Sequence, residues 1–393
     1  MSTIRQVALL MRINKDYDRQ IIAGVSQYAG QNDWSVYLQD EPHERVPKQS
    51  QWLGDGIIAD LDDPETTRIV GRAGVPAVGI GGYSYPAQLP FEIPYVATDD
   101  VANGRLGAEH LVNCGLRHFA FCGLPATPYN SWARHRERAF VDALREAGYN
   151  CAVYRGRHRS ARNWESMQRG LLDWLDGQET PLGIMCCDDP RARHVVEACR
   201  RSGRRIPEDV AVLGVDNDLL MCELCNPPLS SIQHGAVEIG LRAAEVLDRL
   251  MSGQTDMPQW SVVPPKGVVQ RRSTDVMNSP HPTVTEALRF IRENAGVPIS
   301  VSQVARHVAV SRSTLDREFR RCLGHTTHEE IERVRLDVAK RLLTGTDQPL
   351  RVIARQAGYS NEQYFSFVFR NAFHVTPGQY RAGNDLGRSR KRT

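Results

Sequence analysis

The stretch WARHRERAF, residues 132–140, places a tryptophan, a histidine and three arginines within nine residues. With a helical period, Arg136 shares a face with Ala139 and Phe140, three and four residues further on. The other two arginines, Arg134 and Arg138, fall on the opposite face, where we expect them to be solvated. A basic patch for nucleic acid and an ordinary solvated helix face are the alternatives. We predict instead that Arg136 points inward and holds a small ligand.

Carboxylates and an amide recur where predicted strands end. They are Asp60, Asp99, Asp189, Asp216 and Asn217. Ligands of open parallel sheets bind at such strand ends. Carboxylates accept hydrogen bonds from sugar hydroxyls, arginine donates to sugar oxygens, and an indole such as that of Trp132 packs on the apolar face of a sugar. The alternatives to a role in ligand binding are helix or turn capping for Asp60 and Asp216, and a core position for Trp132.

Alternating strands and helices must position these residues. The expected strands are Val7–Ile13, Ser35–Leu38, Gly56–Leu61, Pro76–Gly81, His118–Gly123, Cys151–Tyr154, Leu182–Cys187 and Val210–Val215. The expected helices between them are Arg19–Ala29, Val101–Cys114, Arg134–Ala147 and Ala192–Arg201. Strands that are almost continuously apolar indicate parallel sheets covered on both faces. We predict two such α/β lobes, with a crossing near Tyr95–Asp100.

The last hundred residues have a different pattern, helix after helix without a convincing strand. Residues 284–393 carry 19 Lys and Arg against 11 Asp and Glu, a charge of +8, whereas the rest of the chain carries −5. A basic tail domain on an acidic body suggests that nucleic acid meets the C-terminal end. We therefore predict a two-lobed sensor at 1–276, a linker at 277–283, a DNA-binding domain at 284–384 and a basic tail at 385–393.

Two stretches of this region resemble each other. Each has a short apolar helix containing an alanine (Ala305, Ala354), a tight turn, a serine (Ser311, Ser360), and a second helix ending on phenylalanine. The alanine lets two helices cross closely, and the serine is expected to cap the second helix. The pattern predicts two copies of a helix-turn-helix motif, with a long amphipathic helix around Glu329–Leu343 between the copies. An ordinary helical bundle is the alternative.

The second helix of each copy has the chemistry of base readout, because Arg suits guanine and Asn or Gln suits adenine. Leu315, Phe319 and Leu323 are expected to be buried in the first copy, and Phe365, Val368 and Phe369 in the second. The predicted DNA-binding residues are Ser311, Arg312, Ser313, Thr314, Arg317, Ser360, Asn361, Gln363, Tyr364, Ser366 and Arg370.

The second copy carries a long string typical of one family. It reads Ile353-Ala354, Gly358-Tyr359, Gln363-Tyr364-Phe365-Ser366, Phe369-Arg370, Phe373, Thr376-Pro377 and Tyr380-Arg381. On these residues the region resembles the AraC-type transcription activators. The resemblance implies that both motifs enter successive major-groove segments on one face of duplex DNA, roughly one helical turn apart.

The body resembles the periplasmic-binding-protein-like sensor of LacI-type regulators. The matching residues are Arg136, Ala139 and Phe140, the pair Asp188-Asp189, and Gly214-Val215-Asp216-Asn217. Together with the helical tail, and with Asn14-Lys15, Tyr17-Asp18-Arg19-Gln20 and Trp52–Gly56, nearly the whole chain resembles the D-xylose operon regulators of bacteria. The resemblance implies sugar contacts at Arg136, Asp189 and Asp216, and further contacts at Tyr17, Asp60 and Trp132. Cys187 departs from the asparagine that is common at this place in LacI-type sensors.

Several function classes find no support. There is no Walker-type loop, no G-x-G-x-x-G spacing, no H-E-x-x-H and no arguable Ser-His-Asp order. We expect no cofactor, no metal and no membrane span, and nine scattered cysteines favour reduced thiols in the cytoplasm.

These observations predict a transcription regulator, expected to be an activator, of D-xylose catabolism genes. Its expected partners are D-xylose as effector, double-stranded operator DNA, RNA polymerase and a second copy of the chain, with Val101–Cys114 as the candidate dimer surface. Another pentose as effector, repression in place of activation, a sugar- or nucleotide-processing enzyme and a transport binding protein are the alternatives.

Overall fold

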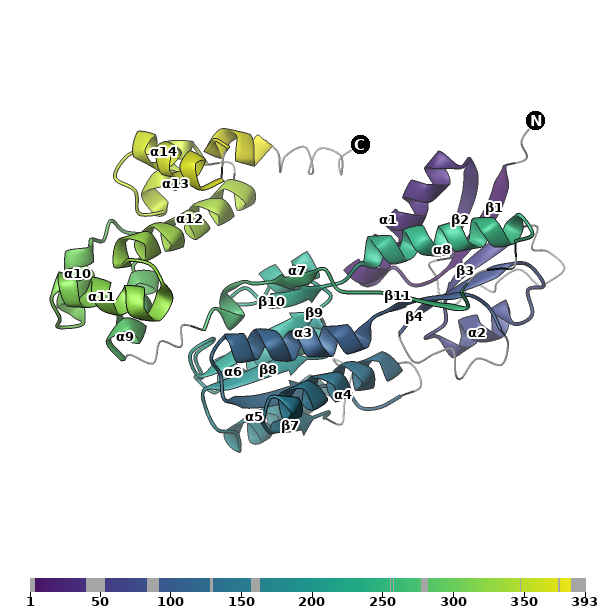
Figure 1. The fold of residues 1–393 in the computed structure, drawn as a ribbon, viewed down its shortest axis with the longest axis horizontal. Helices are drawn as coiled ribbons and strands as arrows, with labels where there is room; N and C mark the ends of the chain where they lie inside the picture. Colours follow the sequence, from purple (N-terminus) through teal and green to yellow (C-terminus); the bar gives the residue numbers. More distant parts are fainter. Residues whose placement is uncertain are drawn as a thin grey trace. The chain divides into compact units, whose positions relative to one another are not determined.

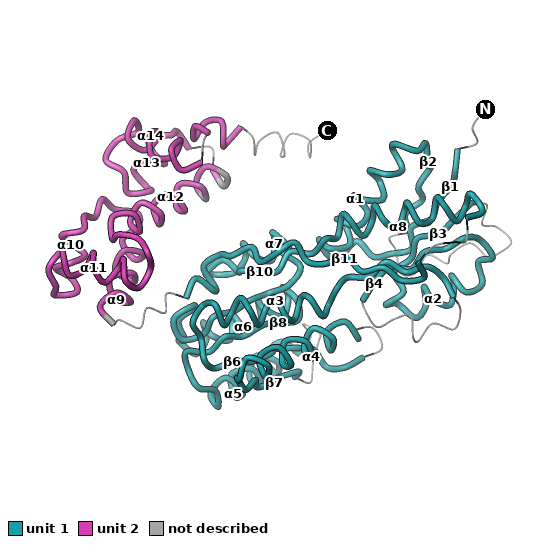
Figure 2. Tube along the Cα trace, in the orientation of Figure 1, with its two compact units in different colours: residues 1–276 teal, residues 277–393 magenta. Residues whose placement is uncertain are grey.

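A computed structural model describes residues 4–39, 54–82, 92–127, 130–156, 163–254, 256, 258–276, 282–346, 348–373 and 375–382. The chain forms two compact units, residues 1–276 and 277–393 (Figure 2). Most of the expected linker and the whole expected basic tail lie outside the described residues. Within those ranges, no helix is long and apolar enough to cross a membrane.

Lobe 1 of the first unit is built on a six-stranded, fully parallel sheet. Its strands, in sheet order, are β11 (Trp260–Val263), β5 (Tyr95–Thr98), β4 (Ala77–Gly81), β3 (Gly56–Asp60), β1 (Arg5–Leu10) and β2 (Trp34–Gln39). Its helices are α1 (Asp16–Gln31), α2 (Pro64–Val70) and α8 (Ala236–Met251). β4 is buried along its whole length, as expected of a strand covered on both faces.

Lobe 2 is also built on a six-stranded sheet, parallel except for one edge strand, β12, which pairs antiparallel with β10. Its strands, in sheet order, are β12 (Gly267–Val269), β10 (Ser230–Gln233), β9 (Val210–Val215), β8 (Leu182–Cys186), β6 (His118–Cys122) and β7 (Cys151–Tyr154). Its helices are α3 (Asp100–Asn113), α4 (Ser131–Glu146), α5 (Trp164–Asp176), α6 (Asp189–Arg201) and α7 (Leu219–Glu223), with a 3₁₀ turn, η3, at Arg272–Thr274.

The lobes are not sequential halves of the chain, contrary to the simplest form of the prediction. The chain passes between them three times, after β5, between β10 and α8, and between β11 and β12. The first passage lies within the predicted crossing Tyr95–Asp100, because β5 of lobe 1 ends at Thr98 and α3 of lobe 2 begins at Asp100. Short strands such as β11 and β12 carry too little apolar pattern to be recognised, so the return of α8 and β11 to lobe 1 was missed.

Helix α8 packs on α1, from the other end of the sensor sequence (Figure 1). A glycine on each helix permits this: a Cβ at Gly24 would lie 2.1 Å from the Val237 carbonyl oxygen, and one at Gly240 would lie 2.0 Å from the Ile21 carbonyl oxygen. Helix α8 also contacts β3, β4 and β5, strands of lobe 1 that lead into one side of the site.

The described part of the second unit is entirely helical, as predicted. Its helices are α9 (Pro282–Glu293), α10 (Val301–His307), α11 (Arg312–Leu323), α12 (Thr327–Gly345), α13 (Leu350–Gln356) and α14 (Glu362–Phe373), and residues 377–382 are helical as well. Two apolar clusters hold them, one around Leu315 and Phe319 and the other around Phe365 and Phe369. The two predicted helix-turn-helix copies are α10–α11 and α13–α14, with α12 between them.

The two copies differ by one residue in the turn. Ala309 and Gly358 both adopt the left-handed conformation after the first helix, with φ of 54° and 80°. Ser311 then caps α11 by accepting from the Thr314 amide. In the second copy the turn is longer, so Asn361 caps α14 through the Tyr364 amide. The predicted cap at Ser360 is therefore wrong.

Candidate functional site

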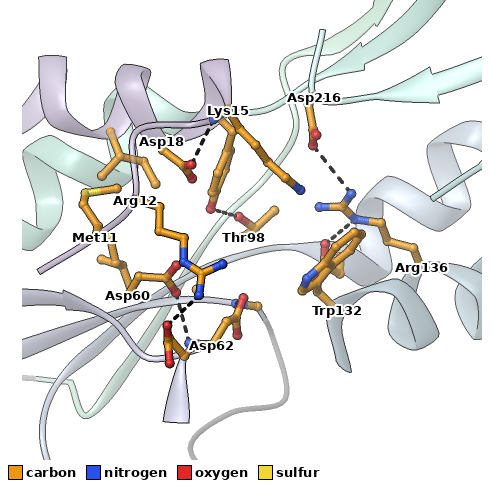
Figure 3. A pocket seen from close by; sticks show the side chains of 17 residues that line it. Met11, Arg12, Lys15, Asp18, Asp60, Asp62, Thr98, Trp132, Arg136 and Asp216 are labelled. Atoms are coloured by element: carbon orange, nitrogen blue, oxygen red, sulfur yellow. Dashed lines mark hydrogen bonds and ion pairs between the residues drawn. The ribbon is translucent and has the colours of Figure 1, made fainter. Parts of the chain in front are cut away.

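A cavity of about 180 Å³ lies between the two lobes, at the carboxyl ends of their strands (Figure 3). Strand ends and first helical turns of both lobes supply its walls. The lining residues are Met11, Arg12, Lys15, Tyr17, Asp18, Ile21, Asp60, Asp62, Asp63, Ile80, Gly81, Gly82, Thr98, Asp100, Trp132, Arg136 and Asp216. Six carboxylates against three cations make this a polar, net acidic site.

Arg136 is held from several sides. Its Nε donates to Asp100 Oδ1 at 2.6 Å, and its Nη1 donates to the Cys187 carbonyl oxygen at 2.7 Å. Its Nη2 lies 3.2 Å from His234 Nε2. Burial alone would lower the pKa of Arg136, but the charges of Asp100 and Asp216 raise it above its ordinary value. The guanidinium is thus a fixed, permanent cation in the cavity wall.

Asp216 stands at the end of β9 on strained backbone, with φ of 110°. His234 Nε2 lies 3.0 Å from its Oδ1, and Arg136 Nη1 lies 3.7 Å away. Burial would raise the pKa of Asp216, but the hydrogen bond with His234 and the charges of Lys15 and Arg136 lower it below its ordinary value. Asp216 is therefore an ionised acceptor facing the cavity.

The carboxylates of lobe 1 behave differently. Burial raises the pKa of Asp18 to about 7, with the charge of Asp60 adding to the effect. Burial likewise raises the pKa of Asp60 to about 6, and that of Asp62 well above its ordinary value. Hydrogen bonds from the hydroxyl groups of a ligand would stabilise the ionised form of these carboxylates, which burial disfavours.

Lys15 joins the two lobes. It precedes α1 of lobe 1, and its Nζ lies 3.5 Å from Asp188 Oδ2 of lobe 2. The same ammonium lies 5.0 Å from the ring centre of Trp132, and the Arg136 guanidinium carbon lies 4.6 Å from it. Two cations therefore lie against the indole ring of Trp132, and each such cation–π contact contributes about 0.5 to 2 kcal/mol.

Five of the seven residues predicted to bind ligand line the cavity: Tyr17, Asp60, Trp132, Arg136 and Asp216. The Tyr17 hydroxyl lies 2.5 Å from Thr98 Oγ1, and the Tyr17 ring packs edge-on against the His234 ring. Arg134 and Arg138 are exposed, as predicted.

The other two residues predicted to bind ligand, Asp189 and Asn217, are not among the residues that line this cavity. Asp189 is fully buried behind the strand ends and accepts from Ser231 Oγ at 2.6 Å and from the Asp218 amide at 2.8 Å. It sits so close to β9 that a Cβ at Gly214 would lie 2.1 Å from its Oδ1. Asn217 Oδ1 accepts from Arg271 Nη2 at 2.9 Å.

Sequence reasoning did not assign Lys15, Asp18, Asp62 or Asp100 to the site. The sequence does contain a pattern that points to Asp100, because the pair Asp99-Asp100 follows a predicted strand. Only Asp99 of this pair was considered as a strand-end carboxylate. Asp99 caps α3 through the Ala102 amide, which leaves Asp100 as the buried partner of Arg136. The Lys15 amide donates to Asp18 Oδ2 at 3.2 Å at the start of α1, and that local pattern gives no sign that both side chains also face a cavity.

The predicted DNA-facing residues are mostly exposed on the second helix of each copy. Leu315, Phe319, Phe365, Val368 and Phe369 are buried as expected, whereas Leu323 is only partly buried. The exposed predicted residues are Ser311, Arg312, Ser313, Arg317, Ser360, Asn361, Gln363, Tyr364 and Arg370, while Thr314 and Ser366 are half-buried.

Several of these side chains have partners within the unit, and those of Tyr364 and Thr314 bear on their role. The Tyr364 hydroxyl donates to Glu332 Oε1 of α12 at 2.8 Å. The Thr314 hydroxyl lies 2.8 Å from that of Ser311. These contacts orient the start of each helix, so Tyr364 and Thr314 are better placed to position the neighbouring residues than to read bases.

Comparison with known families matches three successive segments of the chain. Residues 6–101 match a model described as the XylR N-terminal domain, residues 108–274 a periplasmic binding protein-like domain, and residues 304–383 a helix-turn-helix domain. The xylose operon regulatory protein of Escherichia coli K12 is 37% identical over 381 residues, 96% of this chain and 97% of that protein. The chain belongs to the xylose operon regulatory protein family.

Other xylose operon regulatory proteins agree with this assignment. The one from Haemophilus influenzae is 36% identical and covers 96% of this chain and 98% of its own length. A solved structure of the xylose-binding transcription activator xylR is 36% identical, with a TM-score of 0.76, over 98% of this chain and all of that one. The predicted family, the predicted fold and the conclusion that the chain is a regulator and not an enzyme are confirmed.

Proposed function

We propose that this regulator binds D-xylose in the cavity between its lobes and, in response, activates genes for xylose use. The observation that carries the proposal is the cavity itself, in which the carboxylates of lobe 1 face the fixed cation Arg136 and the indole of Trp132 in lobe 2. Carboxylates accept from sugar hydroxyls and arginine donates to sugar oxygens, so this is a polyol-binding arrangement.

The placement of the cavity explains how sugar would act as a signal. Asp18 and Asp60 come from lobe 1, whereas Arg136 and Asp216 come from lobe 2, so a bound sugar stabilises the closed pair of lobes. The Lys15–Asp188 contact crosses the same gap. The sugar can bias DNA binding only by its difference in affinity for the two states.

Calorimetric titration of the full chain with D-xylose, L-arabinose, D-ribose and D-glucose tests the effector. We expect heat with xylose and a clear preference for it, abolished in Asp60→Asn, which leaves the Arg136 cluster intact. No heat with any pentose, while another small molecule binds, would remove xylose and keep the architecture. A promoter fusion with and without xylose separates activation from repression.

We also propose that the regulator acts as a homodimer and contacts RNA polymerase. The exposed positions of α3, the surface first considered, are polar: Arg105, Glu109 and Asn113. By contrast, Leu219, Leu220 and Leu224 in and beside α7 are each at least 59% exposed, which favours this patch as the face for a second copy.

Sedimentation of Leu220→Glu and of Arg105→Glu separates the two surfaces. We expect only the first variant to be monomeric, and a monomer in the second would return the interface to α3. Transcription in vitro with purified RNA polymerase, xylose and promoter DNA tests the polymerase contact. A chain that binds the promoter without raising transcription would contradict this contact.

A further inference from the structure

The two DNA-binding helices can be aligned residue by residue through their caps and cores. Ser311 and Asn361 cap them, and the fully buried Leu315 and Phe319 of α11 correspond to Phe365 and Phe369 of α14. A constant offset of fifty residues joins all three pairs. The offset also pairs Arg320 with Arg370, Ser313 with Gln363, and Arg317 with Phe367.

Phe367 occupies the centre of the outward face of α14. It follows the buried Phe365 by two residues, which is about 200° around a helix and thus opposite the core. Its side chain is 62% exposed, so the ring is available to a partner outside the domain. Its equivalent on α11, Arg317, is also exposed.

The neighbours of Phe367 on this face are exposed and polar except for Tyr364, an aromatic residue three positions earlier whose hydroxyl donates to Glu332. Gln363 lies four residues before it and Arg370 three residues after it, so both flank the ring on the helix surface. A phenyl ring between an amide and a guanidinium does not form a broad apolar patch of the kind that binds another protein. It does match a base-pair edge in the major groove, where the thymine methyl is the one apolar group.

We propose that Phe367 reads the 5-methyl group of a thymine in the DNA segment entered by α14. Arg317 holds the same place on α11, and arginine there selects guanine or a phosphate. The two copies therefore read different bases at equivalent positions. The operator segment bound by one chain is consequently asymmetric, although the protein motif is repeated.

Selection of bound duplexes from a random DNA library tests the proposal with the full chain. Wild type should enrich thymine at one position of the α14 segment, and Phe367→Ala should lose that enrichment while every other position stays unchanged. Val297→Ala, another exposed apolar side chain of the same unit, is the matched control and should select as wild type does.

Replacing that thymine by deoxyuridine in the selected duplex removes only the methyl group. Burying one methyl corresponds to about a fourfold change in affinity. We expect wild type to bind the deoxyuridine duplex about fourfold more weakly, and Phe367→Ala to bind both duplexes equally. This loss needs no change in the protein, so it does not depend on how any variant folds.

Three results would overturn the proposal: no thymine enrichment by wild type in the α14 segment, an identical base pattern for Phe367→Ala, or equal affinity of wild type for the thymine and deoxyuridine duplexes. An unchanged base pattern combined with lost activation would instead assign Phe367 to a protein partner. A wild-type chain that selects no sequence at all would contradict DNA recognition itself, which is a separate failure.

Discussion

Arg136 of α4 and Asp100 of α3 form a buried ion pair at the edge of the cavity, with Nε and Oδ1 2.6 Å apart and side chains only 6% and 0% exposed. The pair joins the first residue of α3 to the second turn of α4, and both helices pack on the lobe 2 sheet. Because Arg136 also donates to the Cys187 carbonyl oxygen, the pair fixes the guanidinium for a ligand and holds lobe 2 together.

Asp100→Ala should therefore destabilise the sensor substantially. Removing one partner leaves Arg136 with a buried, partly uncompensated charge, which costs about 3 kcal/mol. Arg105→Ala is the control, since its pair with Glu146 on the same two helices is exposed to solvent and contributes little to stability. Urea unfolding of both variants measures the difference, and equal effects would contradict the argument. By the same reasoning Arg136→Ala weakens folding as well as sugar binding, so it cannot test the sugar site alone.

Asp18→Asn should stabilise the sugar-free sensor at alkaline pH. The pKa of Asp18 is raised from 3.8 to about 7, so the folded chain holds a proton there that the unfolded chain has lost. The free energy of unfolding therefore falls as pH rises through this window, by on the order of 1 kcal/mol for a partly exposed group.

Thermal unfolding at about pH 5 and about pH 8 checks the sign of this effect. The gain in Tm from Asp18→Asn should be larger at the higher pH. Asp16→Asn, in the same helical turn but outside the cavity, controls for the loss of one negative charge near the start of α1. A gain that is larger at the lower pH would show that Asp18 is not the group responsible.

The sequence predicted the architecture well because long apolar strands and the repeated helical motif are local patterns. Its prediction of the site was less complete, and the reason is visible in the double aspartates. In both Asp99-Asp100 and Asp188-Asp189 the first residue caps a helix and the second is buried. Asp100 reaches the cavity because α4 brings Arg136 to it, whereas Asp189 is used by Ser231 and the Asp218 amide. Only tertiary packing distinguishes the two.

Gly358→Ala should destabilise the second helix-turn-helix. Its φ of 80° is unfavourable for a side chain, and a Cβ would lie 2.8 Å from the Ala295 carbonyl oxygen. The left-handed conformation alone costs about 1 kcal/mol, and the contact adds to it. Ala309→Gly is the converse change at the equivalent turn of the first copy and should be neutral or stabilising. Thermal unfolding of the two variants should move in opposite directions, and a stable Gly358→Ala would contradict the predicted strain.

Arg312 and Gln363 are exposed in the first turns of α11 and α14, and neither lies in the sensor unit. Arg312→Ala and Gln363→Ala should each weaken operator binding about tenfold, the loss of one good base or phosphate contact, and leave xylose affinity unchanged. Arg134→Ala, an exposed arginine of the sensor, is the control for charge and should change neither.

The salt dependence of operator binding then separates the two roles. If Arg312 contacts a phosphate, Arg312→Ala reduces the slope of log affinity against log salt by about one, whereas loss of the uncharged Gln363 leaves the slope intact. An unchanged slope in Arg312→Ala, together with relaxed selection at one base, would place Arg312 on a guanine. Retained operator affinity in both variants would contradict the assignment of α11 and α14 as the recognition helices. Among the described helices, these two share a capped start, a buried apolar face and an outward face that carries Arg or Gln.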